Sequence, residues 1–212
     1  VCTGFSIPVA QRFGAQDYKD MRRFVANAGW LASFFAVVMT VIVCLMTRQI
    51  LVWMQTPDNI IDGAYSYIFF VFAGIPATYL YNTLAGIIRA LGDSRTPVYF
   101  LILSSLFNIV LDLFFIVQIG TGTAGAAYAT VIAQAVSGIL CLIYMKKKFD
   151  ILKMHREETR ISTYHLYRLC MMGIPMGLQY SITAIGSIVL QSAVNGLGSR
   201  YVASVAAGTK LF

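Results

Sequence analysis

Long apolar runs separated by short polar segments dominate this chain of 212 residues. No Asp, Glu, Lys or Arg occurs within residues 24–47, 63–88, 113–145 or 169–199. An α-helix needs about 20 apolar residues to cross the hydrocarbon core of a bilayer, so each stretch is long enough to span it. The pattern therefore predicts five complete membrane spans, at about residues 25–46, 64–88, 97–118, 125–145 and 169–194.

The apolar runs indicate helices rather than the strands of a membrane barrel. A barrel strand alternates apolar and polar residues, whereas residues 34–39 (FFAVVM) are apolar at every position. A helix also satisfies all of its backbone hydrogen bonds internally, as hydrocarbon requires. The predicted fold class is all-α, a polytopic bundle of membrane helices.

The composition agrees with a membrane protein. Apolar residues make up 58% of the chain and charged residues 12%, against roughly half and a quarter in soluble domains. The net charge of +7 could suggest nucleic-acid binding, but the Lys and Arg residues lie in short segments between apolar runs instead of forming a basic face. We predict the lipid bilayer as a partner and no nucleic acid.

The distribution of Lys and Arg predicts the orientation of the spans. Thirteen of these residues fall in the connections 11–24, 89–96 and 146–168, whereas only Arg48 and Arg200 fall in the opposite connections. Connections rich in Lys and Arg stay in the cytoplasm. We therefore expect a multi-pass protein of the cell membrane with the three basic connections on the cytoplasmic side.

Residues 146–168 form the one extended polar segment of the sequence. The segment begins with three lysines, which is typical of a solvated stop at the membrane face. We predict that it links two bundles, the first formed by residues 1–145 and the second beginning within residues 169–212. Because the chain lacks an initiator Met and begins inside an apolar segment, we expect it to be part of a longer protein.

Two spans contain a Gly-Ile-Pro sequence, ending at Pro76 and at Pro175. Proline removes a backbone donor and clashes with the preceding turn, so both helices are expected to kink. One interpretation is a pair of hinges for rocking between two access states. The other is that proline is simply common in membrane helices.

Asp112 is the only acidic residue inside a predicted span. An ionised side chain in the bilayer is costly, so it should face the protein interior or a water-filled cavity and mark a functional site. Counting 1.5 Å per residue from Pro97 places it about 22 Å from the cytoplasmic face and so near the outer face. The alternative is a neutral Asp that only holds helices together.

Three further polar residues are expected near Asp112. Thr130 has a similar calculated depth in the next span, and Asn108 and Gln134 each lie one helical turn deeper than Asp112 and Thr130. Carboxylate, amide and hydroxyl oxygens suit a small hard cation, and the carboxylate could instead take a proton. We predict that Asp112, Asn108 and Thr130 bind Na+ or H+, with no other metal and no cofactor.

The sequence gives little support to catalysis. Both histidines lie in the basic connection 146–168, and no span contains a nucleophile with a base or a pair of carboxylates. The four cysteines form no metal-binding pattern. Tyr79 and Asn82, with Gln134, are candidates to line a transport pathway, although structural packing is the favoured role for Tyr79 and Asn82.

Four segments resemble the multidrug and toxic compound extrusion (MATE) family. The most specific is residues 86–97, with the pattern Gly-x-x-Arg-Ala-x-Gly-Asp-x-x-x-Pro. The others are residues 8–15 (PVAQRFGA), residues 108–112 together with 125–130, and residues 173–175. The resemblance extends along nearly the whole chain.

This resemblance implies a transporter of twelve helices in two bundles, of which the five spans are similar to helices three to seven. Members of the family use an ion or proton gradient to export organic cations and other small amphipathic compounds by alternating access. Asn108 and Asp112 match the ion site in helix five, and Thr130 matches the one in helix six. Helix one, which supplies another carboxylate in the family, is not in this sequence.

Two other functions remain open. A lipid-linked saccharide flippase shares the bundle plan but is expected to have a cationic cavity for phosphates, whereas no predicted span here contains Lys or Arg. A membrane scaffold or receptor would tolerate apolar residues at Asp112. The exported compound, the coupling ion and the oligomeric state do not follow from the sequence.

Overall fold

The computed structural model describes residues 2–53, 61–120, 123–152 and 158–196, which fold into helices and turns without a β-strand. The predicted all-α class is confirmed. The α-helices are α1 (Cys2–Gly14), α2 (Tyr18–Trp53), α3 (Ile61–Ala73), α4 (Ile75–Ala90), α5 (Arg95–Leu113), α6 (Thr123–Lys148) and α7 (Thr163–Gly196). A π-helix, η1 (Phe114–Gln118), continues α5, and a short 3-10 helix, η2 (Asp150–Leu152), follows α6.

The five predicted spans are confirmed as helices that are long and apolar enough to cross a membrane. The span predicted at 64–88 consists of α3 and α4, and the span at 97–118 consists of α5 and η1. Large apolar side chains cover their outer faces; Leu45, for example, is 80% exposed. Hydrocarbon is the solvent in which such faces are stable, so the chain is a multi-pass membrane protein.

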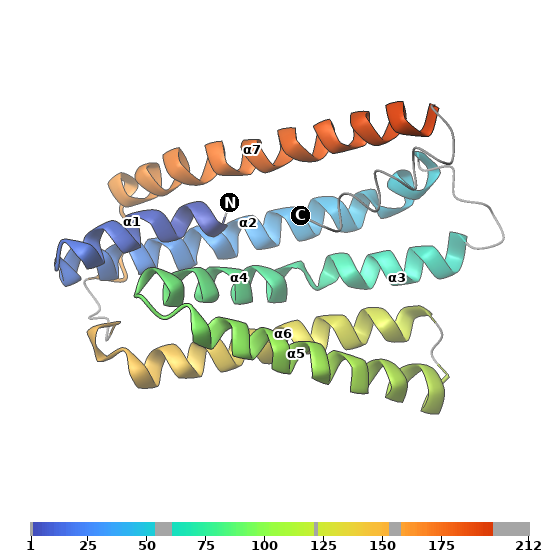
Figure 1. Ribbon diagram of the computed structural model, residues 1–212, viewed down its shortest axis with the longest axis horizontal. Helices are drawn as coiled ribbons and strands as arrows, with labels where there is room; N and C mark the ends of the chain where they lie inside the picture. Colours follow the sequence, from blue (N-terminus) through green and yellow to red (C-terminus); the bar gives the residue numbers. More distant parts are fainter. Residues whose placement is uncertain (1, 54–60, 121–122, 153–157, 197–212) are drawn as a thin grey trace.

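The long helices run side by side in one bundle (Figure 1). α7 lies along one edge, α1 and α2 lie beside it, and the α3–α4 span separates them from α5 and α6. α6 packs against α3, α4 and α5. The three basic connections gather at the left end in Figure 1, which is the predicted cytoplasmic end.

The hydrophobic core is densest at this cytoplasmic end. It combines Phe5 of α1, Met21 of α2, Ile88 of α4, Cys141 of α6 and Leu169 of α7. Because five helices contribute fully or almost fully buried side chains here, this end is held more firmly than the opposite end, where exposed side chains dominate.

Small residues allow two pairs of helices to approach closely. Along α6, the buried Ala133 lets its backbone carbonyl accept a 2.9 Å hydrogen bond from the Ser104 hydroxyl of α5. Between α1 and α7, a Cβ atom added at Gly4 would lie 2.6 Å from the Cα atom of Gly173. Close backbone approach through small residues is how membrane helices associate without a hydrophobic driving force.

The two proline sequences differ in their effect on the helix. At the first, Gly74 separates α3 from α4, and Pro76 occupies the first turn of α4, where its missing N–H is tolerated. At the second, α7 continues through Pro175 without interruption. The helix is interrupted only at Gly74, and the kink at Pro175 and the hinge function of both prolines stay predictions.

The connection between α6 and α7 is shorter than predicted and is anchored to the bundle. Residues 146–148 belong to α6, and α7 already begins at Thr163. Glu158 is only 4% exposed, and both of its carboxylate oxygens accept 2.7 Å hydrogen bonds from the Arg22 guanidinium of α2. The connection is therefore anchored to α2 through Glu158, whereas residues 159–161 are exposed. Residues 153–157, including His155, lie outside the described residues.

Candidate cation site in the membrane

A hydrogen bond between α5 and α6 brings the predicted polar residues together. The Asn108 amide donates to the Thr130 hydroxyl oxygen at 3.4 Å, and that hydroxyl donates to the carbonyl of Ala126 at 2.9 Å. Thr130 thus acts as acceptor and donor at once. The pair joins α5 to α6.

Asp112 and Gln134 lie on either side of this pair. Asp112 is one turn beyond Asn108 toward the outer end of α5, and Gln134 is one turn beyond Thr130 toward the inner end of α6. The Oδ1 atom of Asp112 and the Oε1 atom of Gln134 are both buried and accept no hydrogen bond. Two acceptors without a donor therefore flank the Asn108–Thr130 pair.

The unpartnered groups of the Asp112 site are both acceptors, so a proton or a cation would complement them. A buried acceptor that loses its water without gaining a donor costs about 1–3 kcal/mol, and more when it is charged. Within the described residues, no Lys, Arg or His forms an ion pair with Asp112. A proton or a small cation at the Asp112 carboxylate would remove this cost there, whereas an anion would increase it.

The contact between the two helices differs by one turn from the calculated depths. The sequence placed Asp112 and Thr130 at the same level, whereas the Thr130 hydroxyl contacts Asn108. The helices begin at Arg95 and Thr123, each two residues before the start assumed in the depth count. Two extra residues at both ends shift the register of an antiparallel pair by about one turn.

The π-helix η1 begins two residues after Asp112, and no residue pattern predicts it. The Ile119 N–H donates to the Phe114 carbonyl across five residues at 3.3 Å. Single π-turns of this kind occur often at functional sites, because they rotate the neighbouring side chains without ending the helix. Because of the π-turn, the outermost side chains of this span are rotated about the helix axis relative to Asp112.

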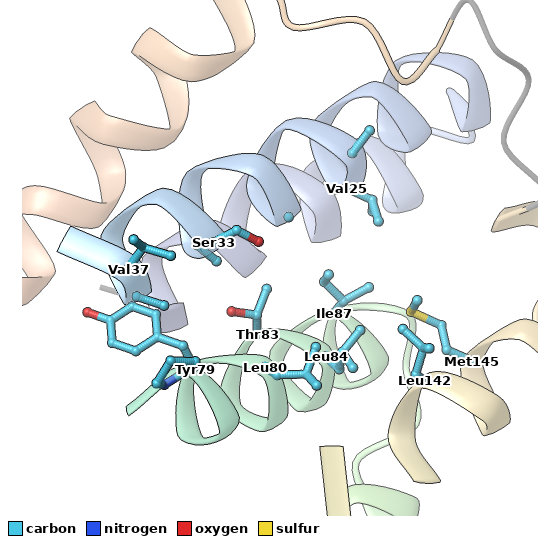
Figure 2. A pocket seen from close by; sticks show the side chains of 15 residues that line it. Val25, Ser33, Val37, Tyr79, Leu80, Thr83, Leu84, Ile87, Leu142 and Met145 are labelled. Atoms are coloured by element: carbon cyan, nitrogen blue, oxygen red, sulfur yellow. The ribbon is translucent and has the colours of Figure 1, made fainter. Parts of the chain in front are cut away.

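The structure does not join the other predicted pathway residues to this cluster. Tyr79 and Pro76 line a separate apolar cavity of about 500 Å3 between α2 and α4. Figure 2 shows this cavity, with Ser33 and Val37 of α2 opposite Tyr79 and Thr83 of α4. The Asn82 amide donates to the Thr78 carbonyl of its own helix at 2.8 Å. A pathway role for Tyr79 and Asn82 stays a prediction.

A second polar cluster, around Asp93, holds the turn between α4 and α5 against α6. The Oδ2 atom of Asp93 accepts hydrogen bonds from the Tyr144 hydroxyl at 2.5 Å and the Thr96 hydroxyl at 2.8 Å, and lies 3.4 Å from the Lys148 ammonium. These bonds, above all that from Tyr144, hold the pKa of Asp93 well below its usual range. The position of Asp93 in a Gly-Asp turn suggested a structural role, but its partners 51 and 55 residues away left no local signal.

Comparison with known proteins identifies the family. A family model described as MatE matches residues 1–114, more than half of the chain. The chain belongs to the MatE family. The resemblance found in the sequence is thereby confirmed, and the matched residues include Asn108 and Asp112.

Full-length relatives extend the likeness of the MatE chain beyond the matched segment. It is 30% identical over 211 residues to the "Probable multidrug resistance protein YoeA" of Bacillus subtilis, covering 95% of this chain and 45% of the relative. It is 24% identical to the "Multidrug export protein MepA" of Staphylococcus saprophyticus, covering 92% of this chain and 44% of the relative. The MatE chain spans somewhat less than half the length of these relatives.

Solved structures agree with the fold. A structure titled "Crystal structure of MATE in the bent conformation" superposes on this chain with a TM-score of 0.91 at 25% identity. The superposition covers 99% of this chain and 47% of the solved one. An outward-facing multidrug resistance MATE family transporter superposes with a TM-score of 0.84 at 25% identity, covering 91% and 43%. The helix arrangement in Figure 1 is therefore that of about half of a MATE transporter.

Proposed function

We propose that this chain is the ion-coupling part of an antiporter that exports small organic amphipathic compounds in exchange for Na+ or H+. The observation that carries the proposal is the pair of buried, donorless oxygens of Asp112 and Gln134 beside the Asn108–Thr130 pair. The printed names of the relatives, which describe multidrug export and resistance, support the substrate class.

In this mechanism the cation or proton binds at Asp112 and neutralises it. Neutralisation removes the cost of the buried charge, so it favours the access state in which α5 and α6 pack closely around the carboxyl group. Release of the ion to the other side restores the charge and the other state. The site in the outer half of the span lets the ion enter from outside as substrate leaves.

The proposal is tested by efflux of a fluorescent lipophilic cation from sealed vesicles that contain the complete protein. Imposed sodium and pH gradients are compared separately for wild type, Asp112→Asn and Asp17→Asn. Asp17 is 47% exposed in the α1–α2 turn, so its substitution removes the same charge outside the membrane. We expect Asp112→Asn to reduce gradient-driven efflux to background and Asp17→Asn to leave it at the wild-type rate.

Each result separates two functions. Efflux driven by one gradient in wild type and lost in Asp112→Asn supports antiport and identifies the ion. Normal efflux by Asp112→Asn contradicts the role of that carboxylate, and the absence of efflux from folded wild type under either gradient contradicts antiport. In the latter case, translocation of a labelled lipid-linked saccharide distinguishes a flippase from a scaffold.

A further inference from the structure

A polar cavity at the cytoplasmic end lies outside the candidate cation site. It has a volume of about 360 Å3 and is lined by Arg23 of α2, by Arg160 and Ser162 of the connection, and by His165 of α7. Arg23 and Arg160 thus bring two permanent positive charges to one cavity. Neither guanidinium forms an ion pair in the part of the chain that the structure describes.

The nearby carboxylates are already engaged. Glu158 binds the Arg22 guanidinium through both oxygens, at 2.7 Å each. Asp20 lies 2.9 Å from Arg12 and 2.8 Å from the Nε2 atom of His165. Among the described residues, the two arginines of the cavity therefore have no ion-pair partner, and an anionic ligand would balance their charge.

The walls of the cavity are fixed by Asn27, which is fully buried. Its amide donates to the carbonyls of Arg23 at 2.8 Å and Arg160 at 3.4 Å, and its carbonyl accepts the Ser162 N–H at 2.9 Å. The backbones that carry the two arginines are thus tied to each other. The fold thus places both arginines beside one cavity, so a shared ligand can bind without rearrangement of the backbone.

One face of α2 continues from this cavity toward the membrane centre as an apolar stripe. Trp30, Phe34, Val37 and Val41 follow Arg23 at intervals close to whole helical turns, and they are 55%, 62%, 60% and 52% exposed. The Trp30 indole donates to the Thr159 carbonyl at 3.3 Å. A polar-tipped aromatic ring between a cationic pocket and apolar side chains is typical of the membrane interface.

We propose that this cavity and stripe bind an anionic phospholipid from the cytoplasmic leaflet. The phosphate lies between the Arg23 and Arg160 guanidinium groups, with the Ser162 hydroxyl in the same cavity, and one acyl chain lies along Trp30 and Phe34. Charge complementarity selects the headgroup, and the direction of the stripe along the span fits a chain that descends into hydrocarbon. The proposal is independent of ion coupling at Asp112.

The test measures lipid binding to the purified complete protein by native mass spectrometry. Phosphatidylglycerol and phosphatidylcholine with the same acyl chains are supplied in equal amounts. Because each arginine near the membrane surface contributes about 1 kcal/mol toward an anionic headgroup, we expect roughly a 30-fold preference for phosphatidylglycerol. The double substitution Arg23→Gln/Arg160→Gln should abolish the preference, and Arg23→Lys/Arg160→Lys should retain most of it.

The matched control is Arg89→Gln/Arg95→Gln, which removes two exposed cytoplasmic arginines outside the cavity and should keep the preference. Equal retention of both lipids by wild type, or an equal loss in the control, would overturn the proposal. Thermal unfolding with glycerol 3-phosphate and with short-chain phosphatidylglycerol distinguishes the source of the phosphate. Stabilisation by glycerol 3-phosphate equal to that by short-chain phosphatidylglycerol would also overturn it, because the stripe would then contribute nothing.

Discussion

At the scale of single residues, Asp93 is the most heavily hydrogen-bonded carboxylate of the cytoplasmic turns. Its partners lie on two helices: Thr96 is in the first turn of α5, whereas Tyr144 and Lys148 are in the last turns of α6. All of them favour the ionised form, which is why its pKa is lowered. The Asp93 carboxylate is charged only at pH values above its pKa, and in that form it holds the α4–α5 turn against α6.

We predict that Asp93→Asn lowers the free energy of unfolding by about 2 kcal/mol at pH 7, because hydrogen bonds to a charged group are lost. The lowered folded-state pKa stabilises the fold fully above the unfolded value of about 4, and this contribution is lost as pH falls below it toward the folded-state pKa. Thermal unfolding in detergent at pH 7 and at progressively lower pH measures the difference. A difference that stayed constant down to the lowest pH would contradict the assignment, and Asp17→Asn should change little at any pH.

Some residues of the candidate site could be predicted from the sequence, whereas their contacts could not. Asp112 could be singled out because an acid within apolar neighbours needs an explanation wherever the helix packs. The contact of Asn108 with Thr130 depended on where each helix begins, which sequence patterns define only to within a few residues. The α6 partners of Asp93, Tyr144 and Lys148, are 51 and 55 residues away along the chain, so only the packed bundle reveals them.

At the scale of helices, the contact between α1 and α7 depends on glycine at both sides. A Cβ atom at Gly4 would lie 2.6 Å from the Gly173 Cα atom and 2.7 Å from the Met172 carbonyl oxygen. These are backbone atoms, so neither can move aside as a side-chain tip would. Close packing of the two helices requires that no side chain lies between them.

We predict that Gly4→Ala separates α1 from α7 and destabilises the protein by about 1–3 kcal/mol, the range typical of overpacking. The measurement is thermal unfolding followed by size-exclusion chromatography of the detergent-solubilised protein. Gly29→Ala is the matched control, since a Cβ atom there meets nothing within 4 Å. An unfolding temperature as high as wild type for Gly4→Ala would show that the two helices need not approach so closely.

Helix positions were largely predictable, whereas their irregularities were predictable only in part. Charge-free runs long enough to span a bilayer have one stable solution, so each predicted span contains a helix. The break at Gly74 follows from the proline two residues later, but the same signal at Pro175 produces no break. Packing of α7 tolerates one missing hydrogen bond, and no local pattern distinguishes the two cases.

At the scale of the whole molecule, the Arg22–Glu158 ion pair fastens the connection between α6 and α7 to α2. The Arg22 and Glu158 side chains are 19% and 5% exposed, and the guanidinium also donates to the Ile151 carbonyl at 3.2 Å. Removing only one partner of a partly buried ion pair destabilises the fold, because the other partner is left unpaired. The connection is therefore part of the folded structure and not a free tether.

We predict that Glu158→Gln and Arg22→Met each destabilise the protein by about 3 kcal/mol, because each leaves one buried partner unpaired. The double variant should be less destabilised than the sum of the two, by about 1 kcal/mol or more. Unfolding temperatures of the four proteins complete this double-mutant cycle. Strictly additive effects would mean that the two side chains do not stabilise the fold as a pair; Lys147→Gln, an exposed charge on α6, should have no effect.

The contacts of α7 with α1 and α2 also bear on how the protein is made. A ribosome synthesises α1 to α6 first, so Gly4, Asp20 and Asn27 are in place before Thr163 emerges. When α7 enters the membrane, the surface against which it packs is already formed. Gly4 of α1 leaves room for the backbone at Gly173, and Asn27 and Asp20 of α2 are in position to bond Ser162 and His165. Correct packing of α7 therefore depends on the earlier packing of α1 and α2, and a misplaced α1 would also displace α7.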